Sequence, residues 1–330
     1  MTYGEQTEKG EAFAIMDRAV DFGINFLDAA EMYPVPPKRE TQGATETIIG
    51  EWLAARGRRN DLVLATKVCG RSANDWFRDD GSPTRLTRAQ IFEAVEKSLR
   101  RLRTDHIDLY QIHWPDRAVS DWGTVPSRFK PFAPAAGETA IEETAAAFAE
   151  LMVAGKIRHF GLSNESPYGL MRFIAAAEKG IGPRPLSVQN AYSLVNRTWE
   201  GGLAEIALRE EVGLLPYSPL AQGYLSGKYR NGALPERSRK ALFNRLQRYE
   251  KPHADAAIAA YVDLARRFGA DPVTFAVAFA LNQPTVASVI IGPSAEGQLE
   301  SNLAAAEFAW SEDMQAAVDD LHQRFGNPCP

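Results

Sequence analysis

The stretch Gly23-Ile24-Asn25-Phe26-Leu27-Asp28-Ala29-Ala30-Glu31-Met32-Tyr33 decides the fold of this chain. Residues 24–27 predict a short buried strand that stops at the carboxylate of Asp28, and Tyr33 follows on the next loop. A carboxylate at the end of a buried strand costs free energy unless it is paired or catalytic. The stretch therefore predicts a strand whose carboxyl end carries chemistry.

Two further apolar segments end in the same way, at Lys67 and at His113. Residues 61–68 and 107–113 are nearly continuous apolar runs, which are typical of strands buried on both faces of a parallel sheet. Further strands are predicted at four places, each separated from the next by helical pattern: 156–163, 186–189, 212–217 and 287–291. Because strands and helices alternate, we expect parallel pairing with right-handed crossovers.

The spacing of the strand ends predicts a (β/α)8 TIM barrel. These ends are Asp28, Lys67, His113, Ser163, Gln189, Tyr217 and Ile291. The shorter gaps match the roughly 30 residues of one barrel unit, and the longer ones contain long loops. A doubly wound sheet is the alternative, but no G-x-G-x-x-G follows the first strand. We predict a single domain over residues 1–330, with a lid loop at 114–137 and a cofactor-clamp loop at 218–252.

One barrel strand is not accounted for. Seven strands are predicted, and the chain opens on a segment that leads directly into a helix. We therefore expect the first barrel strand to be missing or truncated, with only Thr2 and Tyr3 as its remnant. Loss of a barrel strand would leave unpaired strand edges.

The composition narrows the class of protein. The chain has 330 residues, of which 45% are hydrophobic and 24% charged, as in an ordinary globular protein. Its net charge of −5 argues against nucleic-acid binding. The polar amino terminus and the lack of a long apolar run predict neither a signal peptide nor membrane insertion. Two widely separated cysteines, Cys69 and Cys329, favour a cytoplasmic location.

The polar strand ends predict a tuned general acid, because such ends converge at one face of a barrel. A buried ammonium such as Lys67 lowers the pKa of a neighbouring tyrosine, and a carboxylate keeps that ammonium in place. A histidine can orient a substrate oxygen. Taken singly, Asp28, Lys67, His113 and Tyr33 also fit ordinary capping, solvated or packing roles; their joint placement favours catalysis. The five histidines lack metal-ligand spacing, so no metal site is predicted.

Seven ordered motifs resemble the aldo-keto reductase family and cover nearly the whole chain. They begin with the opening stretch, Leu-Ala-Thr-Lys-Val and Asp-Leu-Tyr-Gln-Ile-His-Trp-Pro, and continue at 155–165, 187–193, 216–229 and 288–294. Residues 34–43 and 216–252 look closest to the bacterial Tas-like branch, which is related to potassium-channel β-subunits. Members of the family usually begin with a hairpin, which this chain would lack.

The resemblance implies a role for each matching residue. Tyr33 would be the proton donor and His113 would orient the carbonyl, while Asp28 and Lys67 tune the tyrosine. NADPH would be the cofactor. The resemblance implies that its carboxamide contacts Ser163, Asn164 and Gln189 and that its nicotinamide ring stacks on Tyr217. The implied pyrophosphate contacts are Ser218, Pro219, Leu220, Gln222, Gly223, Lys228 and Arg239, and those of the adenosine end are Gly292, Ser294, Gln298 and Asn302. The chain departs from the family at Ala295 and Ser301, where an arginine and an acid are usual.

The implied function is NADPH-dependent reduction of an aldehyde or ketone to an alcohol. The alternative is a cofactor-binding regulatory or sensor subunit with little turnover, and the complete set of four catalytic residues favours the enzyme. A metal-dependent barrel hydrolase ranks third. The partner would be a small-molecule carbonyl compound, and the sequence leaves its identity and the oligomeric state open.

Overall fold

The computed structural model describes residues 1–119, 135–245 and 247–329. The chain divides into two compact units. The first contains residues 1–119, 135–189 and 292–296, and the second contains residues 190–291 and 297–329, apart from residue 246. The single-domain prediction is not tested by this division. The predicted lid loop at 114–137, with Trp122, Phe129 and Phe132, falls mostly outside the described residues.

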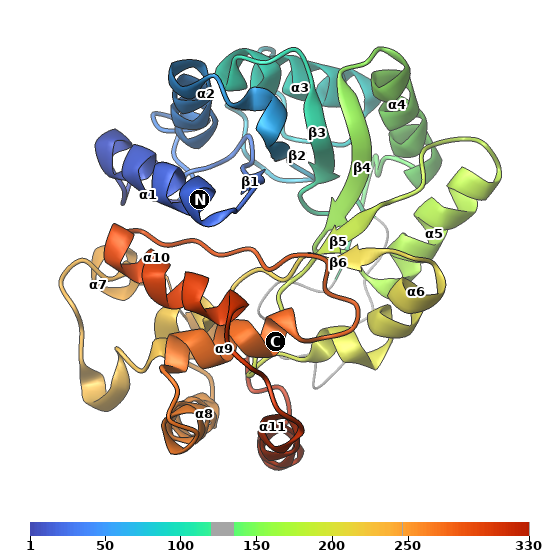
Figure 1. Ribbon diagram of the computed structural model, residues 1–330. Helices are drawn as coiled ribbons and strands as arrows, with labels where there is room; N and C mark the ends of the chain where they lie inside the picture. The colour runs from blue at the N-terminus through green and yellow to red at the C-terminus, as the bar shows by residue number, and fades with distance from the viewer. Residues whose placement is uncertain (120–134, 246, 330) are drawn as a thin grey trace. The chain divides into compact units, whose positions relative to one another are not determined.

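The first unit is built on five parallel strands in chain order (Figure 1). They are β1 (Phe26–Asp28), β2 (Val63–Val68), β3 (Ile107–Ile112), β4 (Ile157–Ser163) and β5 (Ser187–Gln189). Each strand pairs with the next in parallel register. This order confirms the parallel pairing that the alternating pattern predicts. β1 begins at Phe26, two residues later than predicted. The Asn25 carbonyl nevertheless already accepts a hydrogen bond from the Val63 N–H at 2.7 Å.

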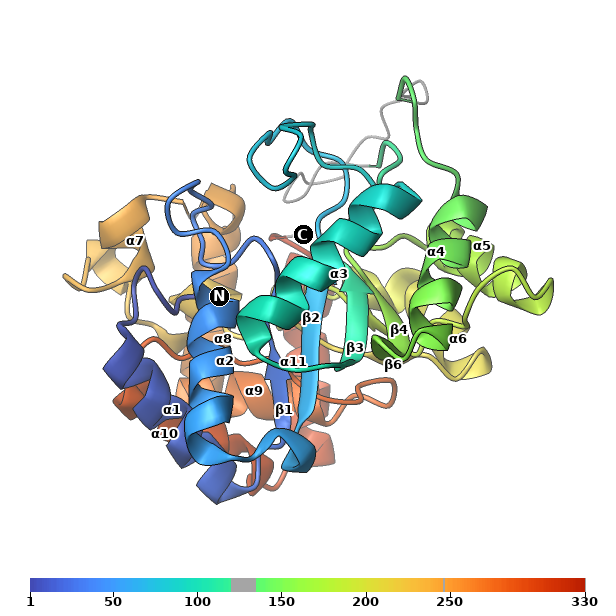
Figure 2. The same cartoon turned by 90° about the horizontal axis from the view of Figure 1, so that it is seen from above.

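Helices connect these strands and follow one another in chain order along the sheet (Figures 1 and 2). They are α1 (Lys9–Phe22), α2 (Ala44–Arg56), α3 (Arg88–Leu102), α4 (Ile141–Val153) and α5 (Pro167–Glu178), with a short 3-10 turn η1 (Arg59–Asp61). Thr87 caps α3, since its side chain accepts a hydrogen bond from the Gln90 N–H. Ser166 caps α5 in the same way.

An aromatic row forms much of the packing between β3 and β4 and the helices that cover them. Tyr110, Phe148, Phe160 and Phe173 are all buried, and successive ring centroids lie 5.5, 4.5 and 5.5 Å apart. Ring pairs at these separations add to the free energy that their burial contributes. The row holds α4 and α5 against the strands that carry the polar ends.

The second unit is mainly helical in the part that the structure describes. Its helices are α6 (Leu203–Arg209), α7 (Arg239–Phe243), α8 (Ala254–Arg267), α9 (Pro272–Leu281), α10 (Glu296–Leu303) and α11 (Glu312–Phe325). Short 3-10 turns are η2 (Thr198–Gly201), η3 (Ala221–Ser226), η4 (Arg230–Gly232), η5 (Gln247–Tyr249) and η6 (Ala304–Ala306). α9 is almost wholly buried, and Phe275 packs on Trp310 with ring centroids 4.9 Å apart.

The last predicted strands are only partly formed. β6 covers Gly213–Leu214 alone, and 287–291 contributes an isolated bridge at Ile290. Pro216 interrupts the ladder because it has no N–H to donate. Its carbonyl nevertheless accepts from the Ile290 N–H at 2.8 Å, so the two segments do run side by side. The predicted loop at 218–252 also differs, since it contains α7 and several 3-10 turns.

Candidate active site

Three predicted polar side chains lie at the carboxyl ends of neighbouring strands of the first unit. Asp28 is the last residue of β1, Lys67 lies next to the end of β2, and His113 directly follows β3. Because the three strands pair in parallel, their carboxyl ends share one edge of the sheet. Tyr33 returns to the same edge from the loop after β1. The structure therefore brings together all four residues that the sequence predicts to be catalytic.

Lys67 is a fully buried cation that Asp28 neutralises. Its side chain is 0% exposed, and its Nζ lies 2.5 Å from Asp28 Oδ2 and 2.7 Å from the Ala29 carbonyl oxygen. Burial lowers the pKa of Lys67, and the adjacent carboxylate opposes this shift. A buried charge of this kind is tolerated only when it is paired and hydrogen-bonded. The ammonium is thus held in one position at the end of β2.

Tyr33 and His113 lie against each other beside this cation. The Tyr33 hydroxyl is 3.5 Å from His113 Nε2, and the two rings meet edge to face. Lys67 Nζ lies 5.1 Å from the centre of the tyrosine ring. Burial and the charge of Lys67 lower the pKa of His113 well below its ordinary value. The imidazole is therefore neutral near pH 7 and can offer a hydrogen bond without carrying charge.

The three residues predicted to bind the cofactor carboxamide are adjacent to His113. Asn164 Nδ2 donates to the His113 carbonyl at 2.9 Å and to Ser163 Oγ at 3.1 Å. Ser163 Oγ in turn donates to the Gln189 carbonyl at 2.6 Å. Ser163, Asn164 and Gln189 thus form one connected polar group at the ends of β4 and β5.

Gln111 belongs to this site although the sequence reasoning missed it. It is 0% exposed, and its Nε2 donates to Asp28 Oδ1 at 3.1 Å. Gln189 Nε2 donates to the same oxygen at 3.0 Å and lies 3.4 Å from Gln111 Oε1. The available signal was an amide inside an apolar strand, two residues before His113 and so on the same face.

Glu31 is a second residue that the sequence reasoning missed. Its buried carboxylate binds both Arg78 guanidinium nitrogens, at 2.8 and 3.0 Å, and accepts from the Cys69 N–H at 2.7 Å. The Glu31 N–H also donates to the Lys67 carbonyl at 3.1 Å. Despite burial, Arg78 and these N–H groups lower the pKa of Glu31. Glu31 thereby ties the loop that carries Tyr33 to the backbone of Lys67 and Cys69.

The predicted phosphate contacts in the second unit cluster on a tightly turned loop. Left-handed backbone recurs at Ser218, Ala221, Gln222 and Gly223, with φ of 56°, 49°, 54° and 99°. A Cβ on Gly223 would lie 2.7 Å from Lys228 Cε, so glycine lets the lysine pack against the loop. Burial, together with the charge of Arg239, lowers the pKa of Lys228. Two cations near a nest-like loop form a setting suited to an anion.

Other predicted contacts of the second unit border this loop. Leu220, which follows Pro219, packs on Val277 and Ala278 of α9. The Tyr217 hydroxyl lies 3.4 Å from Arg248 Nη1, a cation that the sequence reasoning did not single out. The sequence signal for Arg248 is an arginine that precedes an aromatic residue in a basic loop, and this signal is weak.

The four residues predicted at the adenosine end do not form one described cluster. Gly292 and Ser294 lie in the first unit, where the Ser294 carbonyl accepts from Thr7 Oγ1 at 3.1 Å. Gln298 and Asn302 lie on α10, and Asn302 Nδ2 donates to the Gln298 carbonyl at 2.5 Å. α10 begins at Glu296, two residues after Ser294. The shared adenosine site stays a prediction.

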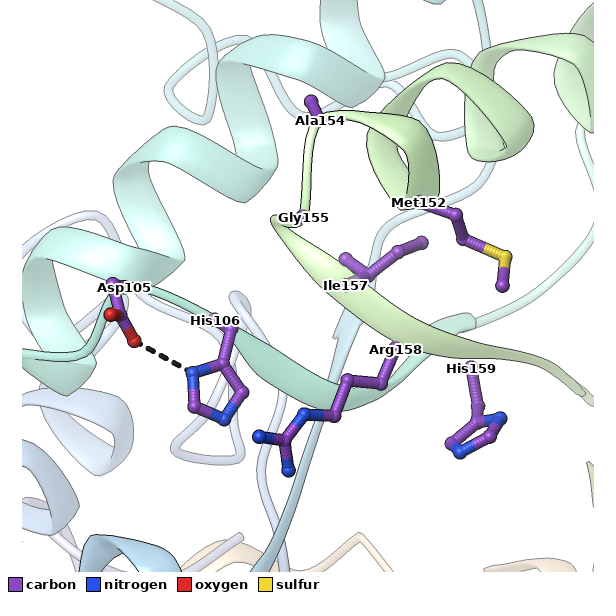
Figure 3. A pocket seen from close by; sticks show the side chains of 8 residues that line it. All are labelled: Asp105, His106, Met152, Ala154, Gly155, Ile157, Arg158 and His159. Carbon is purple, nitrogen blue, oxygen red and sulfur yellow. Dashed lines mark hydrogen bonds and ion pairs between the residues drawn. The ribbon is translucent and has the colours of Figure 1, made fainter.

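A surface hollow of the first unit lies away from the four residues that are predicted to be catalytic. It measures about 710 Å³ and is lined by Asp105, His106, Met152, Ala154, Gly155, Ile157, Arg158 and His159 (Figure 3). These residues precede or open β3 and β4, so the hollow lies at the amino ends of the strands. In barrel enzymes catalysis occurs at the carboxyl ends. The volume of this hollow therefore does not mark the reaction site.

Within 1–119, 135–245 and 247–329, no group of His, Cys, Asp and Glu could hold a metal ion. Over the same residues, no helix is long and apolar enough to cross a membrane.

Parallel strands joined by helices carry a carboxylate, a buried lysine and a histidine at their carboxyl ends, and a tyrosine on the next loop lies beside them, which is the arrangement of an α/β-barrel enzyme. Comparison with known proteins gives the family. The Aldo/keto reductase family matches residues 1–323, and the chain belongs to it. Protein tas of Escherichia coli is 46% identical over 332 residues, which cover 100% of this chain and 94% of that protein. This likeness confirms the resemblance to the Tas branch.

Two further relatives broaden the comparison. A probable voltage-gated potassium channel subunit beta of Arabidopsis thaliana is 29% identical over 312 residues, covering 93% of this chain and 85% of that protein. The structure of a glycerol dehydrogenase from Gluconobacter oxydans superposes with a TM-score of 0.73 and 28% identity, covering 96% of this chain and 86% of the other. The predicted α/β-barrel class is confirmed. The family identifies the chain as an oxidoreductase of carbonyl compounds, whereas the predicted missing strand beside β1 stays a prediction.

Proposed function

We propose that the protein is a cytoplasmic NADPH-dependent carbonyl reductase in which Tyr33 delivers the proton. One observation carries the proposal: Lys67 is fully buried, bound to Asp28, and placed 5.1 Å from the Tyr33 ring. A nearby ammonium favours the phenolate over the phenol. Tyr33 can therefore release its hydroxyl proton to an oxygen that is gaining negative charge.

The four side chains would have different roles in the reduction of a small aldehyde or ketone. Its carbonyl oxygen would lie within hydrogen-bond reach of Tyr33 Oη and His113 Nε2. Nicotinamide, when bound, supplies a hydride to the carbonyl carbon. Tyr33 Oη then gives its proton to the forming alkoxide, Lys67 stabilises the phenolate left behind, and Asp28 keeps Lys67 in place. Positioned proton transfer of this kind typically contributes 10²- to 10⁴-fold in rate, as an order of magnitude.

His113 orients the carbonyl and is not the acid in this proposal. Its pKa lies well below the ordinary value because it is buried and faces Lys67. A neutral imidazole can donate one hydrogen bond to the carbonyl oxygen, but its N–H is too weak an acid to transfer that proton at neutral pH. The proton must then come from Tyr33, whose hydroxyl is 3.5 Å from the histidine.

Residues of each unit fit part of a dinucleotide phosphate. In the first unit, Ser163, Asn164 and Gln189 offer hydroxyl and amide groups that suit a carboxamide. In the second unit, Lys228 and Arg239 are neighbouring cations beside a loop of left-handed residues, as a polyanion requires. We assign both sets to NADPH on the strength of the family.

Tyr33→Phe tests the proposed acid. We expect aldehyde-dependent NADPH oxidation to fall by about 10²-fold or more, because the ring remains but the proton is gone. NADPH binding, followed by quenching of protein fluorescence, should persist. Tyr168→Phe is the matched control, since Tyr168 lies exposed on α5. Unchanged turnover in Tyr33→Phe would remove the tyrosine from the mechanism.

A regulatory subunit with little turnover is the second candidate, favoured by the likeness to a plant potassium-channel subunit. The same assay separates the two functions. A wild-type chain that binds NADPH but reduces no member of a panel of aldehydes and ketones would support the regulatory function.

A further inference from the structure

We propose that Gln111 is a positioning residue that orients Asp28 and Gln189 together, and so aims Gln189 Oε1 at the carboxamide N–H of the nicotinamide. The inference rests on the proposed function and extends it to a residue inside the barrel wall. It concerns how the proton-donating group and the cofactor end are aligned with each other.

Gln111 lies at the centre of the first unit's polar site. It is in register with Lys67 on β2 and with Gly161 on β4. Its Nε2 reaches past β2 to Asp28 Oδ1 at 3.1 Å, and its Oε1 lies 3.4 Å from Gln189 Nε2. One fully buried amide thus contacts a member of the catalytic group through its donor and a cofactor residue through its acceptor.

Hydrogen-bond polarity fixes the direction of both amides. The Asp28 carboxylate can only accept. Its Oδ2 binds Lys67, so its Oδ1 is left for Gln111 Nε2 and Gln189 Nε2, at 3.1 and 3.0 Å. Turning over the Gln189 amide would place its oxygen against Asp28 Oδ1 and Gln111 Oε1, all of them acceptors. Gln189 Oε1 therefore faces away from Asp28, as an acceptor for an N–H group.

The strand neighbours of Gln111 are shaped to admit this side chain. A Cβ at Gly161 would lie 3.1 Å from Gln111 Cγ and 2.9 Å from Ser187 Oγ. Contacts at that separation force the neighbouring atoms to move. An amide in such a buried position costs free energy unless it is hydrogen-bonded, and an aliphatic side chain would fill the space without that cost. The presence of an amide at position 111 is therefore explained by the two groups that it orients, Asp28 and Gln189.

Gln111→Met tests the inference, because methionine keeps the volume and removes both polar atoms. Binding of NADPH is compared with binding of 2′,5′-ADP, which has the adenosine and 2′-phosphate but no nicotinamide. We expect the NADPH dissociation constant to rise by up to about tenfold, as for the loss of one hydrogen bond between neutral groups, and that of 2′,5′-ADP to stay unchanged. Equal changes for both ligands, or none, would overturn the inference.

Gln111→Glu gives a second readout that a purely structural role would not produce. The charged groups that face this position are Asp28 on β1 and Lys67 on β2; β4 and β5 present Gly161 and Gln189, which do not titrate. Ionised, the new carboxyl repels Asp28, whereas its protonated form can donate to Asp28 Oδ1. We expect NADPH affinity to recover as the pH falls from about 9 to about 6.

Controls keep this inference separate from the proposed function. Wild type and Gln111→Met should show no such recovery, and a Gln111→Glu variant that is flat with pH would overturn the inference even if Gln111→Met fails to fold. A wild-type chain that binds NADPH without reducing any carbonyl would overturn the proposed function, while the binding comparison at Gln111 still holds. A wild-type chain that binds no NADPH would overturn both.

Discussion

At the scale of single residues, the first unit places charges in its interior and pairs each one. Lys67 is bound by Asp28, Glu31 by Arg78, and Glu46 by Arg101, whose Nε lies 2.6 Å from Glu46 Oε2. Breaking a buried pair typically costs about 3–5 kcal/mol, because it leaves one charge uncompensated. The pairs therefore make the local geometry around Tyr33 hard to change.

His113 gives the residue-scale prediction about pH. Its folded-state pKa is well below the ordinary 6.5, so below pH 6.5 the unfolded chain binds a proton that the folded chain does not. The stability that neutral His113 contributes is present above pH 6.5 and is lost as the pH falls below it, by up to about 1.4 kcal/mol per pH unit. Urea unfolding at a series of pH values should show a steeper loss for wild type than for His113→Gln.

The control for this measurement is His159→Gln, because His159 is exposed at the surface. It should follow the wild-type curve. If His113→Gln follows that curve as well, the neutral buried state of His113 does not contribute to the pH dependence.

At the scale of elements, β4 has a glycine where its neighbours need room. Gly161 pairs with Gln111 on β3 and with Ser187 on β5. The side chains of both neighbours occupy the space in which a Cβ would sit. The polar layer formed by Gln111 and its neighbours thus depends on one residue having no side chain.

Gly161→Ala should therefore destabilise the protein by about 1–3 kcal/mol, the usual cost of overpacking. Gly10→Ala is the matched control, since a Cβ at Gly10 in α1 would meet nothing within 4 Å. That change should stabilise by about 0.5–1 kcal/mol, because alanine is favoured over glycine in a helix. Urea unfolding of both variants measures the two effects, and the same sign for both would contradict this account.

Elements were more predictable from the sequence than the contacts between them. Apolar runs that end at Asp28, Lys67 and His113 correctly placed β1, β2 and β3, because strand burial leaves a strong pattern. Gln111 was missed because its value depends on distant partners: Asp28 is 83 residues away and Gln189 is 78. Periodicity shows which face a residue takes and cannot show which side chain it meets. β6 was overpredicted because Pro216 lies inside its apolar run.

At the scale of the whole molecule, the two units carry different parts of the proposed chemistry. The first unit holds Tyr33, Lys67, Asp28 and His113, and the second holds Lys228 and Arg239. Burial and the neighbouring arginine both lower the pKa of Lys228, which reports a region short of negative charge. A phosphate group would relieve that repulsion.

Arg239→Ala tests this division of work. NADPH carries a 2′-phosphate that NADH lacks, and an arginine binds phosphate through charge-assisted hydrogen bonds. We expect the variant to weaken NADPH by about tenfold or more and NADH by much less, measured as the rise in melting temperature that each cofactor produces. Arg209→Ala on α6 is the control, because Arg209 is exposed and pairs with the equally exposed Glu205 one helical turn away. Equal weakening of both cofactors would mean that Arg239 does not read the 2′-phosphate.

The buried pair of Lys67 and Asp28 has one more consequence. With a neutral imidazole and a tyrosine hydroxyl beside it, the proposed catalytic group as a whole carries no net charge. Asp28 is the counter-ion of Lys67, and the pair is neutral before any ligand binds. Long-range electrostatic attraction therefore has little to act on at these four residues, and uncharged carbonyl compounds reach them without a penalty. Ionic strength should influence how the second unit's cations meet a phosphate far more than how the first unit transfers a proton.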